Sequence, residues 1–247
     1  MTGGGARSLH ASAPRLRAIV LSGAVVLVST GCLPAPATAE GREIASLYTI
    51  FLAAAAVVAA IVVGSTTWAI LRYRRRSDEL PVQTHGNTRL EALWTLLPAL
   101  TVAFLFVAGF IVLARVESRS ALPGAVVDVT AFRWGWSFSY ADQGVSISGI
   151  GEPGPEVVLP VGEPVRIRLG AADVIHAFYV PEFLFKRDAN PHQTTEFEFT
   201  IEDEGTYRGQ CAEFCGIYHA RMPFSIVAVD RPTYDAWIAE QGGSARP

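Results

Sequence analysis

Cysteine is scarce in this chain, which has only 3 cysteines among 247 residues. A small secreted scaffold held together by disulfides carries several cysteine pairs, so the low count argues against that class of protein. Cys32 stands alone near the N-terminus, whereas Cys211 and Cys215 are separated by only three residues. A single disulfide between Cys211 and Cys215 stays open as an interpretation if the domain faces an oxidising compartment.

Basic residues are outnumbered in the second half of the chain. Residues 117–247 contain 10 Lys and Arg against 18 Asp and Glu, whereas residues 1–116 contain 10 Arg against 5 acidic residues. So acidic a domain is a poor binder of nucleic acid, and we expect no nucleic-acid partner. The acidic residues keep an exposed domain soluble, and they can also steer a basic protein toward it.

Charged residues are absent from two long hydrophobic runs, residues 47–71 and residues 93–114. Each run is long enough to cross a hydrocarbon core of about 30 Å as a helix. The short loop between them is rich in arginine, which places that loop in the cytoplasm by the positive-inside rule. We therefore expect residues 47–116 to form a transmembrane hairpin in contact with membrane lipid, both ends facing outward, with a kink at Pro98.

The first 31 residues resemble an export signal. Three arginines precede an apolar stretch, residues 18–28, that is too short to span a bilayer. The residues before Cys32 are similar to a lipobox, which would leave Cys32 as a lipidated N-terminus, whereas the small residues ending at Ala39 fit ordinary signal peptidase. We favour the lipobox because lipidation would explain why an isolated cysteine stands at this position. Residues 32–46 would then form a linker.

Residues 117–231 show the sequence pattern of a β domain. Strand-like runs occupy residues 125–132, 134–140, 165–169 and 197–201. Alternation of hydrophobic and polar residues marks half-buried strands, and turn signals rich in Gly and Pro separate them. Short strands at this spacing predict a β-sandwich or small barrel of about 100 residues. Residues 232–247 would close this membrane-anchored, all-β chain with a short helix and a tail.

A short segment near the C-terminus collects soft metal ligands. Cys211, Cys215, His219 and Met222 follow the pattern Cys-x3-Cys-x3-His-x2-Met, and His176 lies upstream. Soft donors select copper, iron–sulfur clusters or zinc over hard cations. Methionine is a poor zinc ligand and a common copper ligand, so copper is the leading interpretation. A zinc site stays open as an alternative, but it would leave the methionine unused.

The number of thiols favours two metal ions over one. A blue-copper site uses one Cys, two His and a weak axial Met, so a second thiolate exceeds its needs. Two thiolates can instead bridge two copper ions, with one imidazole on each. Any one of these residues alone is more often a buried structural residue than a ligand, but their coincidence reverses that expectation. A membrane-anchored copper chaperone, which also combines Cys-x3-Cys with a distant His, is the main alternative.

Four segments of the sequence resemble subunit II of the haem–copper cytochrome c oxidases. They are Leu-Glu-Ala-Leu-Trp-Thr-Leu-Leu-Pro at residues 90–98, Trp-Gly-Trp-Ser-Phe-Ser-Tyr at 134–140, Asp-Val-Ile-His at 173–176, and residues 209–223 around the two cysteines. The resemblance extends from the hairpin to Val229. It implies a cupredoxin-like fold that carries a binuclear copper centre, CuA.

The resemblance also implies a role for each candidate ligand. Cys211 and Cys215 would bridge the two metals, and His176 with Met222 would complete one copper. The second copper would be completed by His219 and by a backbone carbonyl from the residue between the cysteines. That residue is Glu213, whose side chain would also reach a magnesium ion shared with subunit I.

Three further roles carry over from the family, each with a simpler alternative. Trp134 would receive the electron from the donor, although a core aromatic is the alternative. Glu91 would lie at the mouth of a proton pathway, or would only end a membrane helix. Asp173 would help to dock cytochrome c, or would act as a turn or cap residue. Family members usually have Tyr in place of Gly135, so the aromatic surface is thinner here.

One loop departs from the family pattern. Residues 186–191, Lys-Arg-Asp-Ala-Asn-Pro, run directly into His192 without the Gly-Arg that usually follows. This loop lies near the subunit I interface in the family, so its contacts there are expected to differ. We interpret His192 as a loop residue rather than a ligand.

The resemblance implies the electron-accepting subunit of a respiratory oxidase in the cell membrane, with the C-terminal domain on the outer face. Such a subunit takes electrons from cytochrome c, soluble or membrane-bound, and passes them to haem in subunit I, where oxygen reduction drives proton pumping. The sequence has no haem motif, so the cytochrome-c oxidase reaction belongs to the complex with subunit I and the further subunits. A quinol oxidase subunit II lacks the copper ligands, and their presence argues against it.

Overall fold

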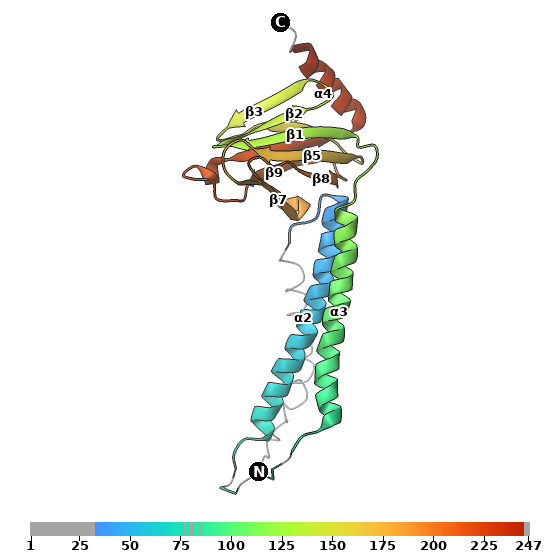
Figure 1. Ribbon diagram of the computed structural model, residues 1–247, viewed down its shortest axis with the longest axis vertical. Coiled ribbons are helices and arrows are strands. Elements are labelled where there is room, and N and C mark those ends of the chain that lie inside the picture. Colours follow the sequence, from blue (N-terminus) through green and yellow to red (C-terminus); the bar gives the residue numbers. More distant parts are fainter. Residues whose placement is uncertain (1–32, 77, 80–81, 84, 245–247) are drawn as a thin grey trace, which may run out of the picture. The chain divides into compact units, whose positions relative to one another are not determined.

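Two long helices open the part of the chain that the computed structural model describes, which is residues 33–76, 78–79, 82–83 and 85–244. They are α2 (Ala39–Arg72) and α3 (Thr88–Val116), and they pack against each other (Figure 1). Both are long and apolar enough to cross a membrane. The predicted export signal and Cys32 lie outside the described residues.

Both helices begin several residues before the uncharged runs from which they were predicted, and each has a polar capping residue at its start. The Thr38 hydroxyl accepts a hydrogen bond from the Gly41 backbone N–H at 3.0 Å. The Asn87 side chain accepts one from the Leu90 N–H at 3.2 Å. Such caps satisfy backbone donors that have no partner within the helix. Helix α2 therefore begins inside the segment expected to be a linker, and α3 continues through Pro98 as one helix.

Within the described residues, ten strands form a sandwich of two five-stranded sheets. The strands are β1 (Ala125–Phe132), β2 (Gly135–Tyr140), β3 (Val145–Ile150), β4 (Glu156–Pro160), β5 (Pro164–Ala171), β6 (His176–Val180), β7 (Phe185–Ala189), β8 (Thr195–Thr200), β9 (Gly205–Cys211) and β10 (Pro223–Val229). The sheet orders are β3-β2-β1-β5-β8 and β4-β10-β9-β6-β7. Helix α4 (Arg231–Ser244) follows, where a short helix was predicted.

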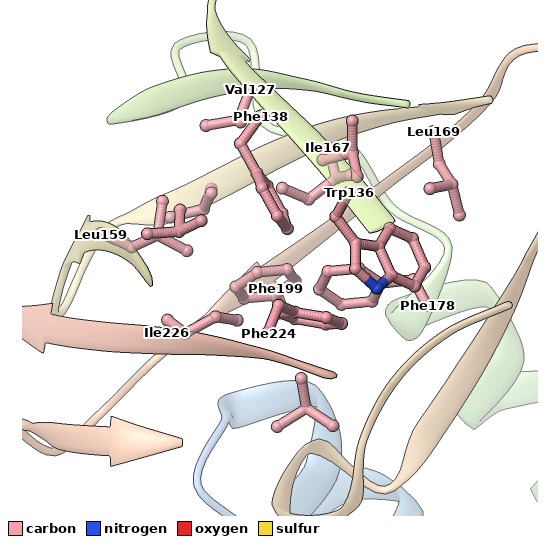
Figure 2. Packing of buried hydrophobic residues seen from close by; sticks show 14 of the residues in the cluster. Val127, Trp136, Phe138, Leu159, Ile167, Leu169, Phe178, Phe199, Phe224 and Ile226 are labelled. Carbon is pink, nitrogen blue, oxygen red and sulfur yellow. The ribbon is translucent and has the colours of Figure 1, made fainter. Parts of the chain in front are cut away.

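Aromatic rings fill the space between the two sheets (Figure 2). Trp136 is fully buried, and its ring centroid lies 5.1 Å from that of Phe224, which in turn lies 4.8 Å from that of Phe178. Large buried aromatic side chains dominate the energetics of such a core. The Trp136 Nε1–H also donates a hydrogen bond to the Met222 carbonyl at 3.1 Å, so the core holds the end of the ligand-bearing segment in place.

One acidic residue breaks the predicted alternation in β8. Glu198 was expected on the solvent side of the strand, but its side chain is buried. It accepts hydrogen bonds from Arg166 Nε at 2.7 Å and from the Ser120 backbone N–H at 2.7 Å. The segment between α3 and β1, which contains Ser120, therefore covers this face, and Arg166 of β5 supplies the opposite charge. A buried carboxylate requires such partners.

The residues just before α2 attach to the sandwich. The Ala37 N–H donates to the Glu182 carbonyl at 2.8 Å, and the Ala37 carbonyl accepts from the Glu202 N–H at 3.1 Å. Thr38 forms an isolated antiparallel bridge with Ile201, directly after β8. Ala37 and Thr38 are both buried. The start of the membrane helix is thus also part of the folded β domain.

Candidate metal centre

The pairing of β6, β9 and β10 brings the candidate ligands to one end of the sandwich. His176 begins β6 and Cys211 ends β9, and these antiparallel neighbours align Phe178 with Cys211. The segment 212–222 then leaves β9 and returns to β10. The Cys211 N–H donates to the Met222 carbonyl at 3.1 Å, which closes this segment at its base. We call residues 212–222 the ligand loop.

Five candidate side chains converge at this end of the sandwich, and a sulfur or nitrogen atom of each lies within 4 Å of one in another. The two sulfur atoms of Cys211 and Cys215 lie 3.9 Å apart. Nδ1 of His176 is 3.8 Å from the Cys211 sulfur, and Nδ1 of His219 is 3.6 Å from the Cys215 sulfur. The Met222 sulfur lies 3.9 Å from the Cys215 sulfur. All except the half-buried His219 are buried.

This donor set fits a soft metal. Both described cysteines are free thiols, and their sulfurs and the imidazole of His176 lie within 4.8 Å of one another. Two thiols, two imidazoles and a thioether are donors that copper prefers. The backbone carbonyl of Glu213, 3.3 Å from the Cys211 sulfur, adds an oxygen to the same cluster. A zinc site would leave the thioether of Met222 unused even though it is placed among the other donors.

The two thiols differ in acidity. Burial acts to raise the pKa of Cys211, but hydrogen bonds with His176 and with backbone groups outweigh it and lower that pKa to about 6. Burial and the negative charge of Cys211 together raise the pKa of Cys215. The protein alone therefore favours one thiolate at neutral pH. A bound cation would be needed to hold both sulfurs as thiolates.

Asp173 holds the His176 ring in its orientation. One carboxylate oxygen of Asp173 lies 2.9 Å from Nε2 of His176 and accepts from the Val174 N–H at 2.7 Å. The other accepts from the backbone N–H and Nε of Arg133 at 2.9 and 3.1 Å. Burial acts to raise the pKa of Asp173, but these hydrogen bonds outweigh it and lower that pKa. Sequence reasoning missed this role, because it interpreted Asp173 as a docking residue or as a turn or cap residue.

Replacing Asp173 by Asn should weaken metal binding without unfolding the domain. Loss of a carboxylate that orients a ligating imidazole typically reduces metal affinity by about 10- to 100-fold. Competition with a copper chelator would measure the affinity, and Asp142→Asn provides a matched control in the exposed β2–β3 turn. Equal affinities in the two variants would show that Asp173 has no positioning role.

Trp134 lies against the ligand loop. It occupies the turn between β1 and β2, and its ring meets Tyr218 edge-on with the centroids 4.9 Å apart. A Cβ added to Gly216 would lie 3.3 Å from its ring, so glycine allows this close approach. Gly135 has no room for a side chain, because an added Cβ would lie 2.2 Å from the Gly149 carbonyl oxygen. The second aromatic ring here is therefore that of Tyr218.

Comparisons with known proteins cover both the hairpin and the sandwich. Residues 28–112 match the family described as cytochrome c oxidase subunit II, transmembrane domain, and residues 150–229 match its periplasmic domain. A probable cytochrome c oxidase subunit 2 from Streptomyces coelicolor is 32% identical, over 92% of this chain and 86% of that protein. The chain belongs to the cytochrome c oxidase subunit II family.

Other relatives of the subunit II family agree. A probable cytochrome c oxidase subunit 2 from Nocardia farcinica is 32% identical, over 84% of this chain and 73% of that protein. The solved periplasmic domain of subunit II of cytochrome oxidase from Bradyrhizobium japonicum is 30% identical, with a TM-score of 0.49, over 52% of this chain and 100% of that one. The two family models confirm the resemblance seen in the sequence, and the structure confirms the predicted class of fold, two helices able to span a membrane followed by a β-sandwich. In this family catalysis belongs to the oxidase complex.

Two glutamates with expected roles, Glu91 and Glu213, have side chains that are engaged in other contacts. Glu91 is in the first turn of α3, where its side chain accepts a hydrogen bond from the Asn87 N–H at 3.2 Å, so it also helps to cap the helix. The Glu213 carboxylate pairs with Lys186 at 2.9 Å. His192 is exposed and outside the cluster, as interpreted from the sequence.

Proposed function

We propose that this chain is the electron-accepting subunit of a cytochrome c oxidase. Electrons from cytochrome c would be accepted at a CuA centre and passed to haem in subunit I, where oxygen is reduced and protons are pumped. The observation that carries the proposal is the convergence of two thiols, two imidazoles and a thioether in one cluster. Family membership supports it.

The proposed ligands are residues of β6, the end of β9 and the ligand loop. Cys211 and Cys215 would bridge two copper ions, with His176 and Met222 on one and His219 with the Glu213 carbonyl on the other. When bound, the metal pair would supply a one-electron acceptor. Asp173 orients His176, and Trp136 anchors the Met222 backbone. Burial of the sulfurs keeps water from the site.

Trp134 would be the first aromatic on the donor's side. Its contact with Tyr218 and Gly216 places it against the ligand loop, which supports the proposal. Glu91 would lie at the mouth of a proton pathway into subunit I. The side chain of Glu213 would reach a magnesium ion shared with subunit I. The Glu213 carboxylate pairs with Lys186 in this structure. Lys186 would therefore have to move away from the carboxylate, or share it with the magnesium ion.

The proposed location is the cell membrane, with the sandwich on the outer face. Two membrane-spanning helices support an anchored protein, and the arginines of their connecting loop favour a cytoplasmic hairpin turn. The copper chaperone is the alternative function. Membership of the subunit II family and the placement of Met222 among the other donors favour the oxidase subunit.

Metal content and spectroscopy test the proposed function. The copper-loaded full-length chain should hold two copper ions, because two bridging thiols have an imidazole each. Metal analysis would give the stoichiometry, and electron paramagnetic resonance should show one unpaired electron shared by two copper nuclei. A single copper with hyperfine structure from one nucleus would instead support the chaperone.

A further inference from the structure

Exposed apolar side chains gather at the metal end of the sandwich. Among described residues 123–244, the large hydrophobic side chains that stay exposed are Ile150, Ile175, Phe214, Ile217 and Tyr218. Ile150 ends β3, Ile175 precedes the ligand His176, and the other three belong to the ligand loop. Exposed apolar residues scattered singly need no explanation, but a group confined to one end indicates an interaction surface.

Part of this group lines a shallow surface hollow. Its lining residues are Trp134, Ile150, Gly151, Tyr218 and Arg221. The Trp134 Nε1–H is buried beside Gly216 and has no hydrogen-bond partner among the residues that the structure describes. Aromatic and arginine side chains are the types most enriched at the centres of protein interfaces. The hollow therefore has the composition of a protein-docking site, and two of its lining residues, Tyr218 and Arg221, belong to the ligand loop.

Carboxylates near the surface hollow are already paired. Asp173 pairs with Arg133 and with the ligand His176. The other two carboxylates of the loops at this end have basic partners as well: Glu152 pairs with Arg208, and Glu213 pairs with Lys186, which it shares with Asp188 of β7. Arg221 is exposed and has no ion-pair partner among the residues that the structure describes. The one charged side chain that lines the surface hollow is thus positive.

The acidic run of the domain lies too far away to change this. Glu202, Asp203 and Glu204 precede β9, whereas Cys211 ends it. Seven residues of strand separate the two ends by roughly 20 Å at about 3.3 Å per residue. Charges are screened over about 8–10 Å at physiological salt, so the acidic run contributes little at the surface hollow.

We propose that the redox partner docks on the surface hollow through an apolar patch, with a carboxylate rather than a lysine against Arg221. This inference rests on the proposed function, since it specifies the donor for the same site. Ile150, Tyr218 and the exposed edge of Trp134 would form the dry contact. Arg221 would select the charge of the partner's rim. Acidic steering of a basic donor, the expectation from the net charge, would then be replaced by apolar docking.

A redox-inert probe can test docking apart from electron transfer. The probe is a zinc-substituted basic cytochrome c, used unmodified and with its lysines succinylated, which makes it acidic. Its porphyrin fluorescence would report binding to the oxidase complex that contains this chain. The succinylated probe should bind more tightly than the basic one, and its binding should weaken with added salt.

Three variants and one control separate the apolar contribution from the charge contribution. Ile150→Ser should weaken both probes by about tenfold, because it removes roughly two methylene groups of apolar contact. Arg221→Glu should reverse the preference toward the basic probe, and Arg221→Gln should abolish it. Asp142→Ser, at the other end of β2 and β3, should change neither probe.

Tighter binding of the unmodified basic probe, with no effect of Arg221→Glu, would overturn the docking proposal. So would binding that is unaffected by Ile150→Ser. These outcomes leave the proposed function untouched, because copper content and the shared-electron spectrum are measured separately, on the copper-loaded full-length chain. Conversely, loss of the two-copper signature would refute the proposed function even if the probes bound as expected.

Discussion

Replacing Cys215 by Ser should reduce the copper content from two ions to at most one and abolish the spectrum of an electron shared between two nuclei. The Cys215 sulfur lies 3.9 Å from the Cys211 sulfur, 3.6 Å from Nδ1 of His219 and 3.9 Å from the Met222 sulfur. It is the atom that joins these donors into one cluster. A serine hydroxyl is a hard donor that stays protonated at neutral pH, so it cannot bridge soft metals.

Cys32→Ser is the matched control for this experiment. It makes the same chemical change at a cysteine that is not one of the proposed ligands, so the full copper content and the shared-electron spectrum should persist. Metal analysis and electron paramagnetic resonance of the two full-length variants, loaded side by side, give the comparison. Two copper ions retained in Cys215→Ser would contradict the bridging role and with it the binuclear centre.

Replacing Trp136 by Ala should destabilise the β domain by about 3–5 kcal/mol, the usual cost of removing a fully buried aromatic side chain. Its ring is fully buried and lies 5.1 Å, between centroids, from that of Phe224. Few neighbouring side chains could move into the space, because both sheets pack against the same rings. Denaturant unfolding of the detergent-solubilised chain, followed by near-ultraviolet circular dichroism, would measure the loss.

Trp136→Phe separates packing from hydrogen bonding. Phenylalanine keeps most of the buried ring but lacks the Nε1–H that donates to the Met222 carbonyl. That carbonyl still accepts from the Cys211 N–H, so no buried acceptor is left without a partner. The expected cost is therefore only about 0.5–1.5 kcal/mol. Equal costs for the two variants would show that ring packing is not the main contribution.

The strands were predictable where each side chain's surroundings follow from the strand itself. The alternation in β5 matches its observed burial, and residues 125–132 are β1. Glu198 was not predictable, because its burial depends on Ser120, a residue far away in sequence that covers it. The early start of α2 was also missed, since hydrophobic runs show where a membrane span lies but do not identify its capping residues.

The metal cluster was predictable to the extent that its ligands are neighbours in sequence. Four of them fall within residues 211–222, so their spacing alone indicated a soft-metal site. The sequence could name His176 only as an upstream candidate, because the alignment of β6 with β9 that brings it to Cys211 is a tertiary feature. The role of Asp173 was invisible for a different reason. A carboxylate that binds a partner and one that orients a ligand look the same in a sequence.

Net charge alone does not determine which partner docks at the metal end of the sandwich. The excess of acidic residues in residues 117–247 suggested attraction of a basic donor. That count ignores position and pairing, and the carboxylates nearest to Trp134 are neutralised by basic neighbours. Salt screens the interactions of exposed charges beyond a short distance. The few charged residues around the surface hollow therefore affect docking there more than the net charge of the domain does.

The bridge between Thr38 and Ile201 also has a consequence for the order of assembly. Thr38 is made before both membrane helices, and its partner follows eight strands later. Contacts between residues so distant in the chain form late, because the intervening loop must close first. The segment at Ala37 therefore stays unpaired, and open to processing enzymes, until β8 has formed. Once docked, this segment is buried, so an enzyme that cleaves near Ala37 would have to act before the sandwich is complete.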